Sequence, residues 1–147
     1  MASTGAKLFK GGVAFITGAA SGIGQATAFR FARHGVAALA LSDIRVKHQA
    51  EVSARLQDEY PHLEVLTLPI DTSSEESVVK AHKATVKHLG RIDYAINNAG
   101  VPGVMKPTPD MTSDEFRRGL DINLTGVWLG QREQIRQMLK QEPRSPE

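Results

Sequence analysis

The sequence "ITGAASGIG", Ile16 to Gly24, decides how the rest of the chain is interpreted. It ends an apolar run and places three glycines, Gly18, Gly22 and Gly24, just before a helical pattern begins. Amides at a helix N-terminus are unpaired and carry the positive end of the helix dipole, so they bind phosphate where no Cβ atom blocks the approach. The window therefore predicts a phosphate-binding loop or, more simply, the end of a strand.

The segments on both sides of this window alternate between strand and helix patterns. The apolar run "VAFIT" (Val13–Thr17) is typical of a strand covered on both faces, and residues 22–34 have helical spacing. Further strands are predicted at 37–43, 63–71 and within 91–100, and further helices at 47–60, 73–89 and 112–140. Strands separated by helices of this length predict an α/β fold, a doubly wound parallel sheet of the Rossmann type with strand order 3-2-1-4.

Two of the predicted helices begin with a capping box, a Ser or Thr followed three residues later by Glu. The pairs are Ser73 with Glu76 and Thr112 with Glu115. The last helix also carries apolar residues that are expected to form its buried face. These residues are Leu124, Val127, Trp128, Ile135, Met138 and Leu139.

The composition limits the classes of function. The 147 residues include 18 Lys+Arg and 16 Asp+Glu without a basic block, so no nucleic-acid partner is expected. The absence of cysteine excludes disulfides and thiolate metal sites and is consistent with a reducing compartment. The five histidines are scattered, so no metal site is expected either. No apolar run approaches the ~20 residues that span a bilayer, and the N-terminus lacks a secretory apolar region, so we expect a cytoplasmic protein with no membrane partner.

The spacing of the glycines, G-x-x-x-G-x-G, suggests a different role for each of them. Gly18 would permit the sharp turn, Gly22 the close approach of a ligand, and Gly24 the close packing of helix on strand. Ser21 and Ile23 would then present main-chain amides to a pyrophosphate.

Acidic residues stand at the ends of the second and third predicted strands. Asp43 lies about 20 residues past the last glycine, where a carboxylate can accept hydrogen bonds from ribose hydroxyls and repel a 2′-phosphate. Arg45 could offset that repulsion weakly or be a solvated surface charge. Asp71 could accept a hydrogen bond from an adenine amino group, or serve only turn chemistry. NAD is therefore preferred over NADP, although Asp43 could also be an ordinary polar strand end.

Three stretches, "TGAASGIG" (17–24), "DYAINNAG" (93–100) and "DINLTGVWLG" (121–130), together resemble the short-chain dehydrogenase/reductase family. The resemblance covers the chain from Val13 to about Leu139. It implies binding of NAD or NADP and hydride transfer between this cofactor and a secondary alcohol or carbonyl compound. The cofactor-binding residues that it implies are Gly18, Gly22, Ile23, Gly24, Asp43, Asp71, Thr72, Asn98, Ala99 and Gly100.

The resemblance also implies a catalytic apparatus, of which this sequence carries one residue. Asn123 matches the helix asparagine of the family's active site, whose main chain is associated with a water in a proton relay. Family members donate the proton from a tyrosine that is helped by a lysine four residues later and by an upstream serine. Here Tyr60 and Tyr94 are followed at that spacing by Glu64 and Asn98, so neither forms the pair.

The missing pair leaves two interpretations open. The 147 residues are either the N-terminal part of a longer enzyme, truncated before the fifth strand, or a natural short protein that at most binds the dinucleotide. In both, residues 1–147 form a single, incomplete dinucleotide-binding domain that shows no turnover by itself. The abrupt stop favours truncation. The resemblance further implies an alcohol or ketone substrate, and a homo-oligomer of the full-length enzyme in which the last helix contacts a partner subunit.

Overall fold

The computed structural model describes residues 7–144 and contains one four-stranded parallel sheet. Its strands are β1 (Val13–Thr17), β2 (Ala38–Asp43), β3 (Glu64–Pro69) and β4 (Tyr94–Ile96). Its helices are α1 (Gly22–Arg33), α2 (Val46–Glu59), α3 (Glu75–Leu89), α4 (Ser113–Leu120) and α5 (Gly126–Met138), with a short 3-10 helix at Thr108–Asp110 and a π-helical turn at Asp121–Thr125. The strand order is β3-β2-β1-β4, which confirms the predicted fold class.

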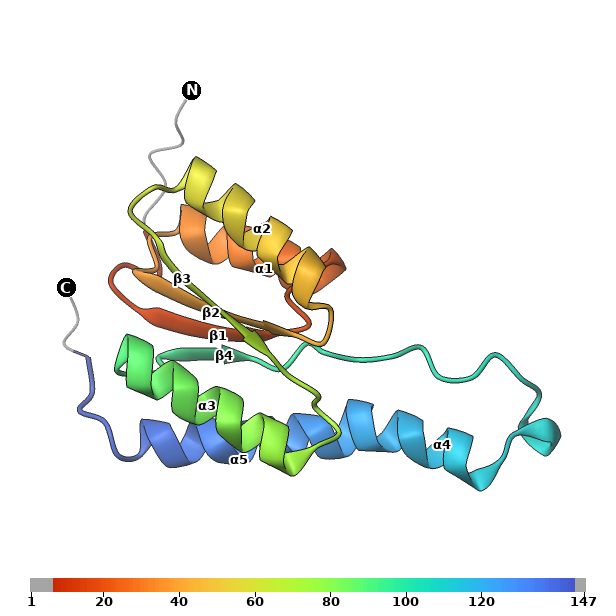
Figure 1. The fold of residues 1–147 in the computed structure, drawn as a ribbon. Helices are drawn as coiled ribbons and strands as arrows, with labels where there is room; N and C mark the ends of the chain where they lie inside the picture. Colours follow the sequence, from red (N-terminus) through yellow and green to blue (C-terminus); the bar gives the residue numbers. More distant parts are fainter. Residues whose placement is uncertain (1–6, 145–147) are drawn as a thin grey trace.

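The helices lie in two layers, with α1 and α2 on one face of the sheet and α3 and α5 on the other (Figure 1). Because alternate residues of a strand point to opposite faces, β1 supplies both layers. Ala14 and Ile16 pack into the core beneath α1 and α2, whereas Phe15 packs into the core beneath α3 and α5. The sheet is thus covered on both faces, as the continuous apolar run of β1 predicts.

The strand β4 forms one edge of the sheet, and it is the shortest strand within residues 7–144. It pairs with β1 through Ala14 opposite Tyr94 and Ile16 opposite Ile96. The Tyr94 ring packs against Phe9, with centroids 5.1 Å apart, and against Phe31 at 5.6 Å. The aromatic contacts anchor the start of this edge strand to the α1 side of the core.

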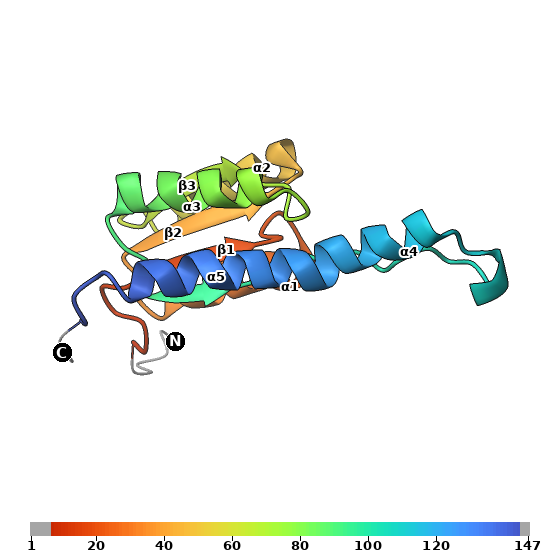
Figure 2. The same cartoon turned by 90° about the horizontal axis from the view of Figure 1, so that it is seen from below.

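The helices α4 and α5 are joined by the π-helical turn into one rod that extends beyond the sheet (Figure 2). The expected buried face of this rod is wrong for Leu124, Trp128, Ile135 and Leu139, which are all exposed. Met138 does pack against the core, and Val127 is half-buried. The rod approaches the sheet through glycines instead: a Cβ on Gly126 would lie 2.6 Å from the Thr72 carbonyl oxygen, and one on Gly130 would lie 2.6 Å from Asn97 Oδ1. The close approach places Gly126 and Gly130 against the body of the protein, together with the buried Leu129.

One of the two capping boxes is confirmed. The Thr112 hydroxyl accepts from the Glu115 amide at 3.2 Å, and the Glu115 carboxylate accepts from the Thr112 amide at 2.9 Å.

The other capping box, assigned to Ser73, is wrong. The N-cap of α3 is Ser74, whose hydroxyl accepts from the Ser77 amide at 3.3 Å. The Ser73 hydroxyl donates to the Asp71 carboxylate at 2.6 Å, because this acceptor lies only two residues away.

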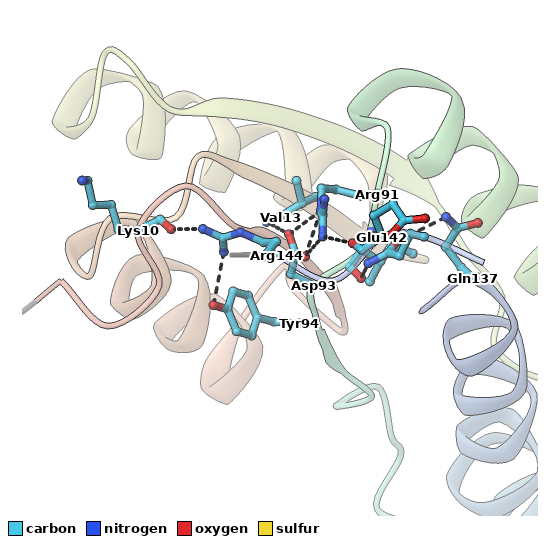
Figure 3. A network of polar contacts seen from close by, with 10 residues as sticks. Lys10, Val13, Arg91, Asp93, Tyr94, Gln137, Glu142 and Arg144 are labelled. Carbon is cyan, nitrogen blue, oxygen red and sulfur yellow. Dashed lines mark hydrogen bonds and ion pairs between the residues drawn. The ribbon is translucent and has the colours of Figure 1, made fainter. Parts of the chain in front are cut away.

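The C-terminal part of the described chain is tied to the starts of β1 and β4 (Figure 3). Asp93 accepts from the Val13 amide at 2.9 Å and forms an ion pair of 2.7 Å with Arg91. Arg144 donates to the Tyr94 hydroxyl at 3.5 Å. These contacts lie at the edge of the sheet opposite to the carboxyl ends of the strands.

Across residues 7–144, no helix has the length and apolar character needed to cross a membrane.

Candidate functional site

The loop between β1 and α1 is shaped by its glycines. Gly18 has φ of 67°, and a Cβ there would lie 2.8 Å from Asn98 Nδ2, so the turn admits only glycine. A Cβ on Gly24 would lie 2.2 Å from the Gly18 carbonyl oxygen, which shows how closely α1 starts against this loop. Around Gly22, by contrast, no described atom lies within 4 Å of an added Cβ. The loop is therefore tightly packed inside and open at Gly22.

The start of α1 presents unpaired amides. Among the described residues, no backbone or side-chain acceptor is paired with the amides of Gly22, Ile23 or Gly24. The N-cap residue Ser21 has an extended backbone, with φ of −164°, and its hydroxyl does not cap the helix. Since the positive end of a helix dipole adds to these free amides, the first turn of α1 is suited to an anion.

A cavity of about 480 Å³ lies at the carboxyl ends of the four strands. Residues that follow every strand contribute to its wall, as expected for a ligand site of an open parallel sheet. The lining residues are Gly18, Ser21, Asp43, Ile44, Arg45, Ile70, Asp71, Thr72, Ala99, Gly100, Val101, Arg118 and Ile122.

Seven of the predicted site residues line this cavity, namely Gly18, Ser21, Asp43, Asp71, Thr72, Ala99 and Gly100. Five others do not line it, namely Gly22, Ile23, Gly24, Asn98 and Asn123. Sequence reasoning missed Arg118 and Ile122, because nothing in a local pattern tells which residues of a distant helix return to the strand ends.

Asp43 is a buried carboxylate held by donors on several sides. Its side chain is only 4% exposed, and its oxygens accept from the Ala20 amide and the Arg45 amide, each at 2.9 Å. Burial acts to raise the pKa of Asp43, but the hydrogen bonds from the Arg45 side chain and from these two amides outweigh it, so the pKa lies below its ordinary value of 3.8. Asp43 is therefore charged at neutral pH.

Arg45 is tied to the site and is not the solvated charge that the sequence left as one alternative. Its Nε lies 3.2 Å from Asp43 Oδ1, and its Nη2 lies 3.3 Å from Asp43 Oδ2. The same Nη2 donates to the Ser21 hydroxyl at 2.8 Å. The guanidinium thus bridges the end of β2 and the loop after β1.

Asn98 joins the ends of β1 and β4. Its Nδ2 donates to the carbonyl oxygens of Thr17 at 3.1 Å and Gly18 at 3.3 Å. The Thr17 hydroxyl in turn accepts from the Asn98 and Ala99 amides, both at 3.0 Å. Thr17 was missed as a site residue, although its place as the last residue of β1 offered a signal. Together, Asn98 and Thr17 hold the glycine loop against the segment that follows β4.

Asp71 has both a structural use and a free oxygen. Its Oδ1 accepts from the amide of Ser73 at 3.0 Å and from the hydroxyl of the same residue, which is the expected turn chemistry. No donor within residues 7–144 is paired with its Oδ2. Asp71 can therefore accept a further hydrogen bond from a ligand in the cavity.

Asn123 lies in the π-helical turn and fastens the loop after β4. Its Oδ1 accepts from the Val101 amide and its Nδ2 donates to the Val101 carbonyl oxygen, each at 2.9 Å. The side chain thus binds the main chain of Val101 through both its oxygen and its nitrogen. Single π-helical turns inside longer helices are frequent at functional sites.

Neither tyrosine is placed for proton transfer at the cavity. Tyr94 begins β4, at the end of the strand away from the cavity, where its hydroxyl meets Arg144. Tyr60 follows α2, and burial together with Glu59 raises its pKa above 10.0, which is the wrong direction for a proton donor at neutral pH. Within the described part of the chain, no group of three or more His, Cys, Asp or Glu could hold a metal ion.

The chain is similar to known dehydrogenases along nearly its whole length. Residues 12–144 match the family described as short chain dehydrogenase. Levodione reductase of Leifsonia aquatica is 40% identical over 129 residues, which are 88% of this chain and 48% of that protein. The chain therefore belongs to the short chain dehydrogenase family. It spans about half the length of the curated relatives that it matches.

Solved structures agree in fold and differ in cofactor. An NAD⁺-bound xylitol dehydrogenase superposes with a TM-score of 0.84 at 36% identity, over 90% of this chain and 50% of that one. An alcohol dehydrogenase from the archaeon Thermococcus sibiricus, complexed with 5-hydroxy-NADP, gives a TM-score of 0.83 at 33% identity, over 89% and 55%. Relatives with this fold thus bind either NAD or NADP.

Proposed function

We propose that these 147 residues form the cofactor-binding part of a short-chain dehydrogenase that prefers NAD(H) to NADP(H). The observation that supports this most directly is the buried, charged Asp43 in a cavity shared with the open glycine loop. The reaction would be hydride transfer between the nicotinamide and a secondary alcohol or ketone. The cofactor, when bound, would supply this hydride chemistry.

The residues present fit an adenine dinucleotide. The free amides of Gly22 and Ile23 would hold the pyrophosphate, and the open space at Gly22 would admit it. Asp43 would accept from the adenosine ribose, and the free Oδ2 of Asp71 would accept from the adenine amino group. Thr72 and Ala99, which also line the cavity, would enclose the adenosine half.

The preference for NAD rests on charge. An ionised and buried carboxylate repels the 2′-phosphate of NADP more strongly than it would in water, since screening is weak where solvent is excluded. The same carboxylate would accept hydrogen bonds from the 2′- and 3′-hydroxyls of the adenosine ribose of NAD.

Catalysis would need groups beyond those gathered in the cavity. The main chain of Asn123 would hold a water in a proton relay, while its side chain keeps the loop at Val101 in place. Neither tyrosine of the 147 residues is followed by the lysine of the family's proton-donating pair. We therefore expect the purified chain to bind dinucleotide without turning over an alcohol.

Titration calorimetry of the 147-residue chain with NADH and NADPH tests the proposal. We expect NADH to bind more tightly than NADPH. The Asp43→Asn variant should lower the ratio of the NADPH to the NADH dissociation constant by about tenfold, because it removes one charged acceptor. Asp114→Asn is the matched control, since Asp114 is 95% exposed on α4, and it should leave the ratio unchanged. A flat NADH titration of folded protein, or an Asp43→Asn variant with the wild-type ratio, would contradict the proposal.

We also propose that the chain associates with a second copy through the exposed apolar stripe of α4 and α5. Exposed apolar side chains recur at helical spacing along one side of this rod, which is unusual for a surface in contact with water only. They are Phe116, Leu120, Leu124, Trp128, Ile135 and Leu139.

The substrate would be a small alcohol or ketone.

A further inference from the structure

A second concave region lies between the helices α3 and α5, away from the strand ends. The two helices run side by side on one face of the sheet (Figure 1), and the groove between them has a volume of about 570 Å³. Sites of roughly 300–1,000 Å³ admit small molecules. The groove shares no lining residue with the cavity at the strand ends. Its lining residues are His82, Lys83, Val86, Lys87, Glu133, Arg136, Gln137 and Lys140.

Both walls of this groove are positively charged. Lys83 and Lys87 lie one helical turn apart on α3, and Arg136 and Lys140 have the same spacing at the end of α5 and just beyond it. Like charges at this spacing repel each other. Glu133 is the one carboxylate among the lining residues. Since the whole chain carries a net charge of only +2, the groove concentrates positive charge locally.

Most of this charge has no counter-ion within the described chain. Glu133 Oε1 lies 2.9 Å from Arg136 Nη1 and 3.1 Å from Arg132 Nε, so two guanidinium groups share it. The three lysines of the groove pair with no acidic residue among residues 7–144. Helix dipoles favour cations in the last turns of α3 and α5, but Lys83 lies in the middle of α3. The groove is therefore suited to an anion from outside the chain.

The buried part of the groove is held in place by packing and hydrogen bonds. His82 lines it and is only 4% exposed. Its Nδ1 lies 2.8 Å from the Val78 carbonyl oxygen, and its Nε2 lies 3.1 Å from Gln134 Nε2. The ring also packs on Phe15, with centroids 4.2 Å apart. The groove thus combines a fixed base with exposed cations on flexible stems, which can close around a compact anion.

We propose that the α3–α5 groove binds a small soluble ligand that carries two or more phosphate groups. Ammonium and guanidinium groups form strong, charge-assisted hydrogen bonds with phosphate oxygens, and several clustered phosphates would meet cations on both walls. A lipid surface fits less well, because none of the large apolar residues exposed within residues 7–144 lines the groove. The inference does not depend on the proposed function, since it concerns a different face of the molecule.

The test is titration calorimetry of the 147-residue chain with inorganic tripolyphosphate, below about 0.1 M salt to limit screening. We expect the dissociation constant to rise by about tenfold or more in a Lys83→Gln/Lys87→Gln double variant, because two charged donors are lost. The matched control is Lys7→Gln/Lys47→Gln, which removes the same charge at two exposed positions outside the groove. It should change the constant by less than about twofold, because exposed charges far from the ligand are largely screened.

A variant with the opposite expected sign separates binding from a merely structural role. Glu133→Gln removes the one carboxylate that lines the groove and releases Arg136 from its ion pair. We expect tripolyphosphate to bind about threefold more tightly to this variant, since an exposed ion pair that competes with the ligand is lost. Weaker binding to Glu133→Gln would contradict the proposal.

Amide resonances show where the anion lies. We expect the largest ¹H–¹⁵N shifts on adding tripolyphosphate at residues 83–87 and 136–140. Shifts confined to residues 21–24 would overturn the groove site and support the phosphate loop of the proposed function instead. Equal losses of affinity in the two double variants would reduce the effect to general charge attraction and would also overturn it. So would capture of the chain by vesicles of phosphatidylcholine and phosphatidylserine without any binding of tripolyphosphate.

Discussion

At the scale of single residues, the site depends on where a side chain is missing as much as on where one is present. Gly18 turns with a positive φ, and Gly24 lies so close to the Gly18 carbonyl that any Cβ would collide with it. Asn98 then fills the remaining hydrogen-bonding positions of this turn with its side-chain amide. The loop is thereby held in one conformation, with the amides of Gly22, Ile23 and Gly24 left unpaired among the described residues.

The Gly24→Ala variant is expected to destabilise the protein by about 3 kcal/mol or more, because the added methyl group would meet a backbone atom that has no room to move. Gly119→Ala is the matched control in α4, where no described atom lies within 4 Å of the added Cβ. It should instead stabilise by about 0.5–1 kcal/mol, since alanine loses less backbone entropy in a helix. Urea unfolding of both variants gives the comparison, and equal effects would contradict it.

At the scale of elements, a buried polar network ties α3, α5 and the end of β4 together. Gln134 and Asn97 exchange two amide hydrogen bonds of 2.8 Å, and Gln134 Nε2 also lies 3.1 Å from His82 Nε2. The other ring nitrogen of His82 lies 2.8 Å from the Val78 carbonyl oxygen, to which it must donate, so Nε2 accepts from Gln134. The ring of His82 packs on Phe15 at a centroid distance of 4.2 Å. The network holds Asn97 and so supports the segment that leads to Ala99 in the cavity wall.

This network makes stability depend on pH. Burial lowers the pKa of His82 below 6.5, against the opposing effects of the bond to Val78 and the charge of Glu133. The folded chain therefore keeps His82 neutral while the unfolded chain gains a proton, so the free energy of unfolding falls as pH drops below about 6.5 and levels off below the folded pKa.

The measurement is the urea midpoint between pH 7.5 and 5, for example at steps of about half a unit. His82→Gln should flatten the loss seen in wild type, because it removes the group whose protonation differs between the two states. His88→Gln, at an exposed position on the same helix, is the control and should follow the wild-type curve. Parallel curves for all three proteins would show that His82 does not carry the effect.

At the scale of the whole molecule, the two sides of the α4–α5 rod have different surroundings. One side rests on the sheet through Gly126, Leu129 and Gly130, and the other carries the exposed apolar stripe. Trp128 has one covered face, because the Arg132 guanidinium lies 4.9 Å from its ring. Six of the twelve large apolar residues that are exposed within residues 7–144 lie on this rod.

We expect the chain to self-associate in a concentration-dependent way, and Leu124→Lys combined with Leu139→Lys to reduce this association. Placing two like charges on a desolvated contact costs more than any apolar contact there can offset. Sedimentation velocity at several protein concentrations checks this, with Val46→Lys as control, since Val46 is an exposed apolar residue on α2 in the opposite layer. A wild-type chain that sediments as a monomer throughout would contradict the expectation.

The sequence by itself determined the order of elements, the parallel sheet and the place of the phosphate-binding loop. These follow from short-range physics: apolar runs, helical spacing and glycines whose φ or lack of a Cβ can be anticipated from their neighbours. The strand ends were expected to meet, because parallel strands carry their carboxyl ends to one edge. For the same reason Asp43 and Asp71 were found together.

Only the tertiary structure decided how these residues are used. Arg45 binds Ser21 and Asp43, His82 meets Gln134, and Leu124 faces outward, and each outcome depends on groups far apart in the sequence. Helical spacing alone predicted the wrong buried face for the last helix, because it cannot tell that glycines bring that helix close to the sheet. Periodicity is a property of neighbours along the chain, whereas burial and pairing depend on which distant surfaces meet after folding.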